Sequence, residues 1–290
     1  MAYRFKRKES IAAGFARIAR EQISVAVTAL EKSPDDGVHD ARRAIKRLRG
    51  LLRLFRKAMP GESFKRANGD LRKAARSLSA VRDAQVRLVV FEKVAKDAKD
   101  DGIAELRRSL TAAVKTAIGA RSRHPPAAAA IATLDSVGTR LPSLEADAGW
   151  PVLCRGLKNT YRRARKAHAA AHAEVSTEAL HAWRRRSKDF QYQTQLLRKI
   201  DPGAMKRRYR KVSKLNDSLG DDHDLAVLDK TLTAARGMPA DLREKLCARI
   251  AKRRKKLQRR AFDLGSELFF EKPSKVIGEL GRQWKDWQRG

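Results

Sequence analysis

The stretch VHDARRAIKRLRGLLRLFRKAMP, residues 38–60, decides the fold because it carries two different faces on one helical period. Apolar residues recur along it at alternating intervals of four and three: Ala41, Ile45, Leu48, Leu52, Phe55 and Met59. This spacing places them on one side of an α-helix. The resulting apolar stripe predicts a helix that packs into a bundle.

A second stripe on the same predicted helix is basic. It consists of His39, Arg42, Lys46, Arg49, Arg53 and Arg56, and Arg43, Arg47 and Lys57 widen it. No acidic residue occurs between positions 41 and 61, although each pair of like charges four residues apart destabilises an isolated helix by about 0.2–0.5 kcal/mol. A helix that needs only solubility normally intersperses Glu. We therefore expect an anion to compensate this face.

The chain repeats this helix. Setting residues 38–60 against LHAWRRRSKDFQYQTQLLRKIDP, residues 180–202, gives 8 identities in 23 positions at an offset of 142. The identities are mostly polar and include His39 with His181, Arg42 with Arg184, Arg43 with Arg185 and Lys46 with Lys188. A duplicated core would preserve mainly apolar spacing, so we interpret the repeat as a duplicated binding surface.

A second repeat follows the first at nearly the same offset. KAARSLSAVRDAQV, residues 73–86, aligns with KLNDSLGDDHDLAV, residues 214–227, and pairs Asp83 with Asp224. In these helices further cations lie opposite apolar residues: Arg72 and Arg76 in the first half, and Arg207, Arg210 and Lys214 in the second. Antiparallel neighbours of this kind can join their basic rows into one groove.

Apolar residues at three- and four-residue intervals continue along most of the chain, and alternating strand-like runs are almost absent. The sequence therefore predicts an all-α fold. Pro and Gly concentrate near the middle, which divides the chain into a first bundle (1–121), a linker (122–151) and a second bundle (152–290). The expected helices are 10–32, 39–59, 62–79, 84–99, 102–121, 151–174, 177–200, 203–219, 222–236 and 240–264, with a shorter one near the C-terminus.

Composition narrows the function classes. The formal net charge is +33, from 66 Lys and Arg against 33 Asp and Glu, which indicates a polyanionic partner. The longest apolar run, 127–134, is much shorter than the ~20 residues of a membrane span, and Arg17 interrupts any secretory signal. Cys154 and Cys247 are too few for a disulfide framework. We expect a cytoplasmic protein with no cofactor.

The aromatic content of the chain helps to distinguish a nucleic acid from a polyanion without bases. Proteins that bind single-stranded nucleic acid stack bases on exposed aromatic rings, and this chain has only 6% aromatic residues, most of them on apolar stripes. The basic stripe therefore favours phosphates without bases. The KRRKK run at 252–256 circles its helix, so we interpret it as a solvated or accessory contact.

The quoted segments, VHDARRAIKRLRGLLRLF, LRKAARSLSAVRDAQV, LHAWRRRSKDFQYQ and LNDSLGDDHDLAVL, together resemble the CHAD family, the conserved histidine α-helical domain. The resemblance implies two pseudo-symmetric antiparallel bundles of four long helices each, and a basic central surface that binds inorganic polyphosphate, often at polyphosphate granules. It assigns phosphate contact to His39, Arg42, Arg43, Lys46, Arg49, His181, Arg184, Arg185 and Lys188. Arg53, Arg72, Arg76, Arg207, Arg210 and Lys214 extend this set from the helix faces described above.

Two other functions stay open at this stage. A non-specific RNA or DNA binder can use the same basic groove. An HD-type metal phosphohydrolase needs two histidines and carboxylates around a metal ion, and His181 together with His223 and Asp224 of the DDHD run is the only candidate set. Asp221, Asp222 and Asp224 are explained more simply as the acidic first turn of a helix. No Walker A loop, nucleophile elbow or triphosphatase E-x-E-x-K motif occurs, and we expect a non-catalytic protein without a metal.

Overall fold

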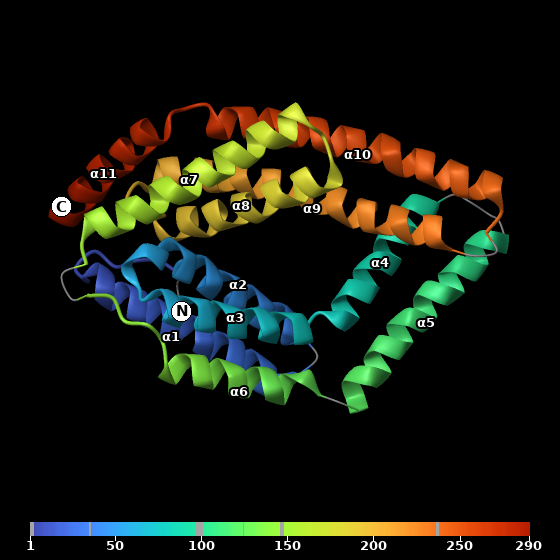
Figure 1. The fold of residues 1–290 in the computed structure, drawn as a ribbon, viewed down its shortest axis with the longest axis horizontal. Helices are drawn as coiled ribbons and strands as arrows, with labels where there is room; N and C mark the ends of the chain where they lie inside the picture. Colours follow the sequence, from blue (N-terminus) through green and yellow to red (C-terminus); the bar gives the residue numbers. More distant parts are fainter. Residues whose placement is uncertain (1–2, 35, 97–100, 124, 146–147, 236–237) are drawn as a thin grey trace.

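The computed structural model describes residues 3–34, 36–96, 101–123, 125–145, 148–235 and 238–290, and every regular element within these ranges is helical (Figure 1). This confirms the all-α prediction. The helices are α1 (Ile11–Lys32), α2 (Val38–Leu54), the short 3-10 helix η1 (Arg56–Ala58), α3 (Gly61–Ser77), α4 (Ala80–Ala95), α5 (Asp101–Arg123), α6 (Pro126–Thr139), α7 (Trp150–Ala173), α8 (Thr177–Leu196), α9 (Pro202–Ala234), α10 (Ala240–Phe269) and α11 (Pro273–Arg289). No helix in these ranges is long and apolar enough to cross a membrane.

Helix α2 lies at the centre of the molecule. The six residues of its predicted apolar stripe are all buried, as are Leu51 and Leu54 beside them. Leu51 and Leu54 are buried on a second side of the helix, because α2 contacts α1 and α3 in its own bundle and also α7 and α8 of the second half. The helix that carries the basic stripe is therefore held by apolar packing on more than one side.

The first bundle consists of α1, α2, α3 and α6, and the second of α7 to α10 with α11 against α7 (Figure 1). The structure differs here from the sequence prediction, because the predicted linker 122–151 contains α6. Its residues Ala130, Leu134 and Val137 are buried in the main core. The run of alanines favours helix, and Pro126 at the first helical position is compatible with it.

A second correction concerns α9, a single helix where the sequence predicted two, 203–219 and 222–236. Asp221 and Asp222 therefore lie in the middle of a helix and are not its first turn. Asp222 is buried and accepts hydrogen bonds from Arg254 at 3.0 Å and from Gln258 at 2.8 Å. Asp222 is therefore stabilised by charge-assisted contacts with α10 and not by a helix N-terminus.

The hairpin of α4 and α5 leaves the first bundle and packs on the far ends of α9 and α10 (Figure 1). A separate apolar cluster holds it there, in which Phe91 and Ile103 meet Leu228 and Leu246. This cluster draws on both halves of the sequence, so the hydrophobic cores do not follow the predicted boundary at 121. The hairpin connects the two halves at one end, and the contacts of α2 with α7 and α8 connect them at the other.

The duplicated helices cross each other at equivalent residues. Tyr192 packs on Gly50, where an added Cβ would lie 3.1 Å from the tyrosine ring, and these two positions are 142 apart, the offset of the repeat. Two equivalent helices that touch at equivalent residues are what a two-fold arrangement produces. The contact favours the predicted pseudo-symmetry, which otherwise stays a prediction.

Gly156 is the point where α7 approaches the end of α2 most closely, and it provides a test of this packing. A Cβ at this position would lie 2.0 Å from the carbonyl oxygen of Leu54. We expect Gly156→Ala to lower the free energy of unfolding by about 1–3 kcal/mol, because backbone must move to accommodate the methyl group.

Gly278 in α11 is the matched control, since a Cβ there would meet no atom within 4 Å. Gly278→Ala should raise the stability by about 0.5–1 kcal/mol through helix propensity. Urea unfolding of both variants measures the difference. Equal effects of the two substitutions would contradict the close approach of α7 to α2.

Candidate functional site

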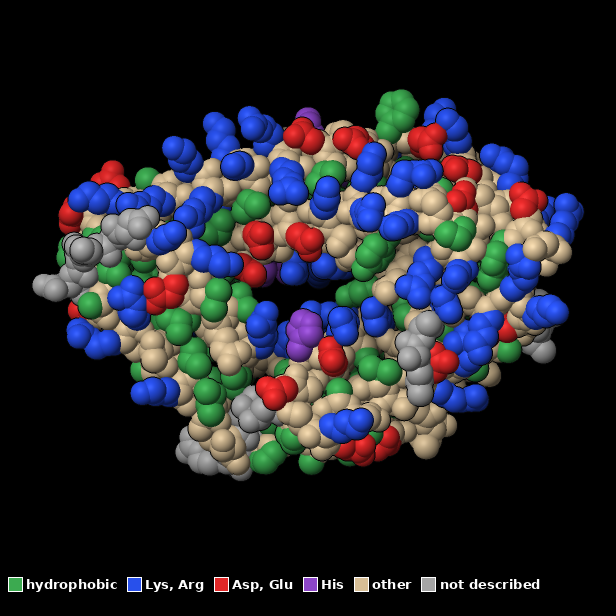
Figure 2. All heavy atoms as spheres, turned by 180° about the vertical axis from the view of Figure 1, so that it is seen from behind, with side chains coloured by type: hydrophobic (Ala, Val, Ile, Leu, Met, Phe, Trp, Pro, Cys, Tyr) green, Lys and Arg blue, Asp and Glu red, His purple; other side chains and the backbone are tan. Residues whose placement is uncertain are grey.

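A cavity of about 1140 Å³ opens between the two halves of the molecule. Figure 2 shows it as a dark hollow near the centre, bordered by Lys and Arg side chains in blue. Helices α2, α4, α8 and α9 supply most of its polar lining, to which Asp36 before α2 and Ser77 of α3 also belong. The C-terminal half of α5 adds Ala117 and Ala120. The positively charged side chains and histidines of the lining are His39, Arg42, Arg43, Lys46, Arg82, Arg87, Arg184 and His223.

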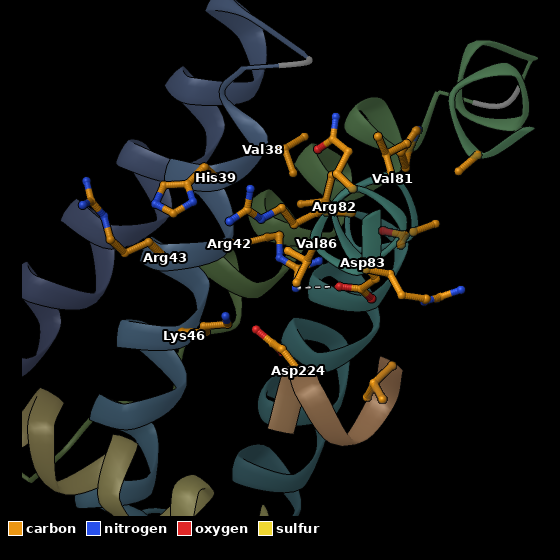
Figure 3. Close-up of a pocket in the computed structure, with 18 of the residues that line it drawn as sticks. Val38, His39, Arg42, Arg43, Lys46, Val81, Arg82, Asp83, Val86 and Asp224 are labelled. Carbon is orange, nitrogen blue, oxygen red and sulfur yellow. Dashed lines mark ion pairs between the residues drawn. The ribbon is translucent and has the colours of Figure 1, made fainter. Parts of the chain in front are cut away.

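Helix α2 contributes the largest share of these side chains because the three- and four-residue spacing of its basic stripe directs them to one side. In Figure 3, Arg42 and Lys46 extend from α2 toward Asp83 of α4 and Asp224 of α9. Arg42 and Asp83 form an ion pair at 3.9 Å between nitrogen and oxygen, which is too long for a hydrogen bond. Arg42 therefore has a carboxylate nearby without being fully engaged by it.

Three guanidinium groups of the cavity have unsatisfied donors. Nη1 of Arg42, Nε of Arg87 and Nε of Arg184 are buried, and none of them meets a hydrogen-bond acceptor among the described residues. A buried donor without an acceptor costs roughly 1–3 kcal/mol, more when the group is charged. The arrangement can therefore be stabilised by an anion that supplies oxygen acceptors inside the cavity.

Burial and, after it, the crowding of positive charge lower the pKa values of two lysines. Lys46 opens to the cavity, yet the surrounding protein partly excludes water from it and Arg42, Arg184 and Lys188 repel its charge, so that its pKa falls to about 8. Burial and the charge of Arg184 lower the pKa of Lys188 as well. Lys46, which lines the cavity, gains an interaction that favours its charged form when an anion occupies the cavity.

The two histidines at matching repeat positions have different surroundings. His39 is exposed and lines the cavity. His181 instead packs against His223, with 4.6 Å between ring centroids and the rings tilted by 38°. Nδ1 of each ring is buried without a hydrogen-bond partner among the described residues. Burial and the neighbouring positive charges lower the pKa of both His181 and His223. The matching sequence positions therefore do not give matching contacts.

The cavity brings together only part of the predicted set. His39, Arg42, Arg43, Lys46 and Arg184 line it, and Lys188 is close enough to Lys46 to affect its pKa. A separate group contains Arg49, Arg53, Arg72 and Arg76. Burial and the charges of the other three arginines lower the pKa of Arg49, so these side chains lie near one another. Arg185, Arg207, Arg210 and Lys214 are exposed on α8 and α9 outside the cavity lining.

Arg53 is engaged by the protein itself. Its Nε donates to Oδ1 of Asp189 at 3.0 Å, and the Asp189 side chain is only 11% exposed. This pair joins α2 to α8 and fixes the crossing of the duplicated helices. Arg49 likewise donates to Asn68 at 3.1 Å. The structure gives both arginines internal contacts, which the helix faces alone did not predict.

Sequence reasoning missed several residues of the cavity. Arg82 and Arg87 reach it from α4, and Tyr192 from α8. The two arginines lie five positions apart, so they form no stripe, and only the Arg82–Asp83 pair in the second repeat marked this region. Their role depends on α4 leaving the first bundle, which no local pattern predicts.

The geometry gives little support to the alternative of an HD-type metal phosphohydrolase. His181 and His223 do meet, and Asp224 lies with His223 in the lining of the central cavity. Within the described ranges, no group of three or more His, Cys, Asp or Glu side chains is placed to hold a metal ion. His168 and His172, at helical spacing on α7, pack against Phe262.

These features define a helical protein with a strongly basic cavity between two halves. The family model of the CHAD domain matches residues 15–233. The chain belongs to the CHAD domain family, as the sequence segments predicted.

Solved structures show the same fold. The chain is similar to PptA from Streptomyces chartreusis with a TM-score of 0.67 and 14% sequence identity, over 89% of this chain and 100% of that one. It is also similar to the CHAD domain from the plant Ricinus communis, with a TM-score of 0.59 and 15% identity, over 98% of this chain and 95% of that one. A search of curated proteins finds no match.

Proposed function

We propose that this protein binds inorganic polyphosphate in the central cavity, performs no chemistry on it and associates through it with polyphosphate granules. The observation that carries the proposal is the pair of buried, unsatisfied guanidinium donors on Arg42 and Arg184, which face one cavity from the two halves of the chain. Phosphate oxygens are suitable acceptors for both, because a guanidinium can donate two hydrogen bonds to one phosphate group.

The rest of the lining supports a polymer of phosphates over one with bases. Tyr192 is the one Phe, Tyr or Trp side chain in the described lining, and burial raises its pKa to about 12. The remaining apolar lining is aliphatic, including Val81, Val86 and Val227. A track for single-stranded nucleic acid needs several exposed rings in succession. The lining thus offers charge and donors without a stacking surface.

Two of the three carboxylates that line the cavity compete with an incoming anion for the cations. Asp83 and Asp224 face Arg42 and Lys46, and burial raises the pKa of Asp224. The third, Asp36, accepts a hydrogen bond from the Ser33 hydroxyl. An incoming phosphate must compete with Asp83 for Arg42. A long chain can do so because it contacts many cations at once, whereas a single phosphate ion cannot. This argues for a polymeric ligand.

Charge reversal at Arg42 and Arg184 tests the site. We expect Arg42→Glu with Arg184→Glu to weaken polyphosphate binding at least about a hundredfold, because it removes two charge-assisted contacts and adds repulsion. The helical circular dichroism signal should stay unchanged. Titration with long-chain polyphosphate at about 0.15 M salt measures the loss.

The matched control is Lys252→Glu with Lys256→Glu, which changes the net charge equally on the exposed KRRKK run of α10. It should weaken binding only a few-fold. If both double variants lose the same affinity, net charge alone attracts the polymer and the assignment to the cavity is wrong.

The lowered pKa of Lys46 predicts that the affinity for polyphosphate depends on pH. A pKa of about 8 in the free protein means that above this pH Lys46 must take up a proton to bind phosphate as a cation. We therefore expect the affinity for polyphosphate to fall as the pH rises above about 8, well below the ordinary lysine pKa of about 10.4.

Lys46→Arg keeps its charge at these pH values, so this variant should lose less affinity between about pH 7 and about pH 10. Lys57→Arg, the same change outside the cavity lining, should retain the pH dependence of the parent. An unchanged pH profile in Lys46→Arg would show that Lys46 does not contact the ligand.

A further inference from the structure

A second cavity, of about 580 Å³, lies between α7 and the junction of α10 with α11. None of its lining residues lines the central cavity. Its size falls within the range of pockets for small molecules, roughly 300–1,000 Å³. Arg162, Arg165 and Lys166 of α7 form one side of it, and Phe269 and Phe270 form another.

Phe270 presents an exposed ring on a fixed backbone. The residue is 80% exposed, the highest value among the large hydrophobic residues of the described chain that are exposed. Its neighbour Phe269 is buried, and the Tyr161 hydroxyl donates to the carbonyl oxygens of Leu268 and Glu271 on either side. Because the backbone is held before and after Phe270, the ring is a positioned apolar surface.

Arg165 connects this ring to the charged side of the cavity. Its Nε donates to the carbonyl oxygen of Phe269 at 3.0 Å. The bond holds the guanidinium beside the aromatic residues and leaves its terminal nitrogens for another acceptor. A guanidinium held in this way loses little freedom when it binds an anion.

The positive charge of this cavity is not neutralised by the protein. Arg162, Arg165 and Lys166 form no ion pair with a carboxylate in the described ranges, whereas the nearby carboxylates have other partners. Glu271 pairs with Lys275 at 2.6 Å and Glu267 with Lys211 at 2.6 Å. The cavity therefore combines one exposed ring with cations that pair with no carboxylate in the described ranges, although Arg162 donates a hydrogen bond to the Asn159 side chain at 3.1 Å.

We propose that this second cavity binds a nucleoside phosphate, whose base stacks on Phe270 and whose phosphates contact Arg165 and Lys166. Base stacking on an aromatic ring and charge-assisted bonds to phosphate are the two interactions such a ligand offers. A single ring fits one base, while a strand of nucleic acid needs a row of them. The inference is independent of polyphosphate binding in the central cavity.

The test uses the full-length Arg42→Glu, Arg184→Glu protein, so that the central cavity contributes little. Titration calorimetry with ATP, with tripolyphosphate and with adenosine separates the base from the phosphates. We expect ATP to bind at least about tenfold more tightly than either of the other two, since each lacks one of the two interactions.

Phe270→Ser in this background should lower the ATP affinity on the order of tenfold, and Phe270→Trp should preserve it. Val89→Ser, which removes another exposed apolar side chain, on α4, should leave ATP binding unchanged. In the parent protein, Phe270→Ser should leave polyphosphate binding unchanged, which keeps the two sites distinguishable.

The proposal is overturned if Phe270→Ser binds ATP as tightly as its parent, or if tripolyphosphate binds as tightly as ATP. Tighter binding of a short single-stranded RNA than of ATP, with the same dependence on Phe270, also contradicts it and identifies a strand-binding surface. Because the Phe270 ring is exposed, the melting temperature of Phe270→Ser should equal that of the parent, and this equality excludes unfolding as the cause.

Discussion

The structure depends on one constraint: α2 must bring many like charges together while it stays folded at the centre of the molecule. Burial and the repulsion of neighbouring cations together lower the pKa of its Lys46 to about 8. Burial of its apolar residues offsets this repulsion, because each fully buried Leu or Ile contributes roughly 1.5–3 kcal/mol. The Arg53–Asp189 pair holds α2 against its duplicated partner α8. Apolar packing thus keeps in place an excess of positive charge that the carboxylates of the protein neutralise only in part.

The cavity follows from a difference between the two halves. At the repeat offset of 142, the single helix α9 corresponds to α3 and α4 together. In the first half the helix breaks at Leu78 and Ser79, so that α4 turns away and its hairpin with α5 packs on α9 and α10. This divergence separates the halves at one place while the apolar cluster around Phe91 and Leu228 joins them at another. The basic faces of α2 and α8 consequently border an open space.

Features that depend on the local helical spacing of residues could be predicted from the sequence. These are the buried stripe of α2, the all-α fold and the family, because apolar spacing and repeated segments can be identified in the sequence itself. Three features depend on contacts between residues distant in sequence. They are the single helix α9 in place of two predicted helices, the helix α6 within the predicted linker, and the ion pair of Arg53 with Asp189. A helix face shows which side an arginine occupies, but it does not show whether a carboxylate 136 positions away meets it. Arg82 and Arg87 were missed for the same reason.

The central claim is that the cavity recognises phosphates and not bases. The most direct measurement is a titration of purified, nucleic-acid-free protein with long-chain polyphosphate and with RNA of equal phosphate content, at about 0.15 M salt, where weak surface attraction is screened. The account predicts tight binding of polyphosphate and much weaker binding of RNA. Equal affinity for the two polymers would contradict it and would indicate a general polyanion surface.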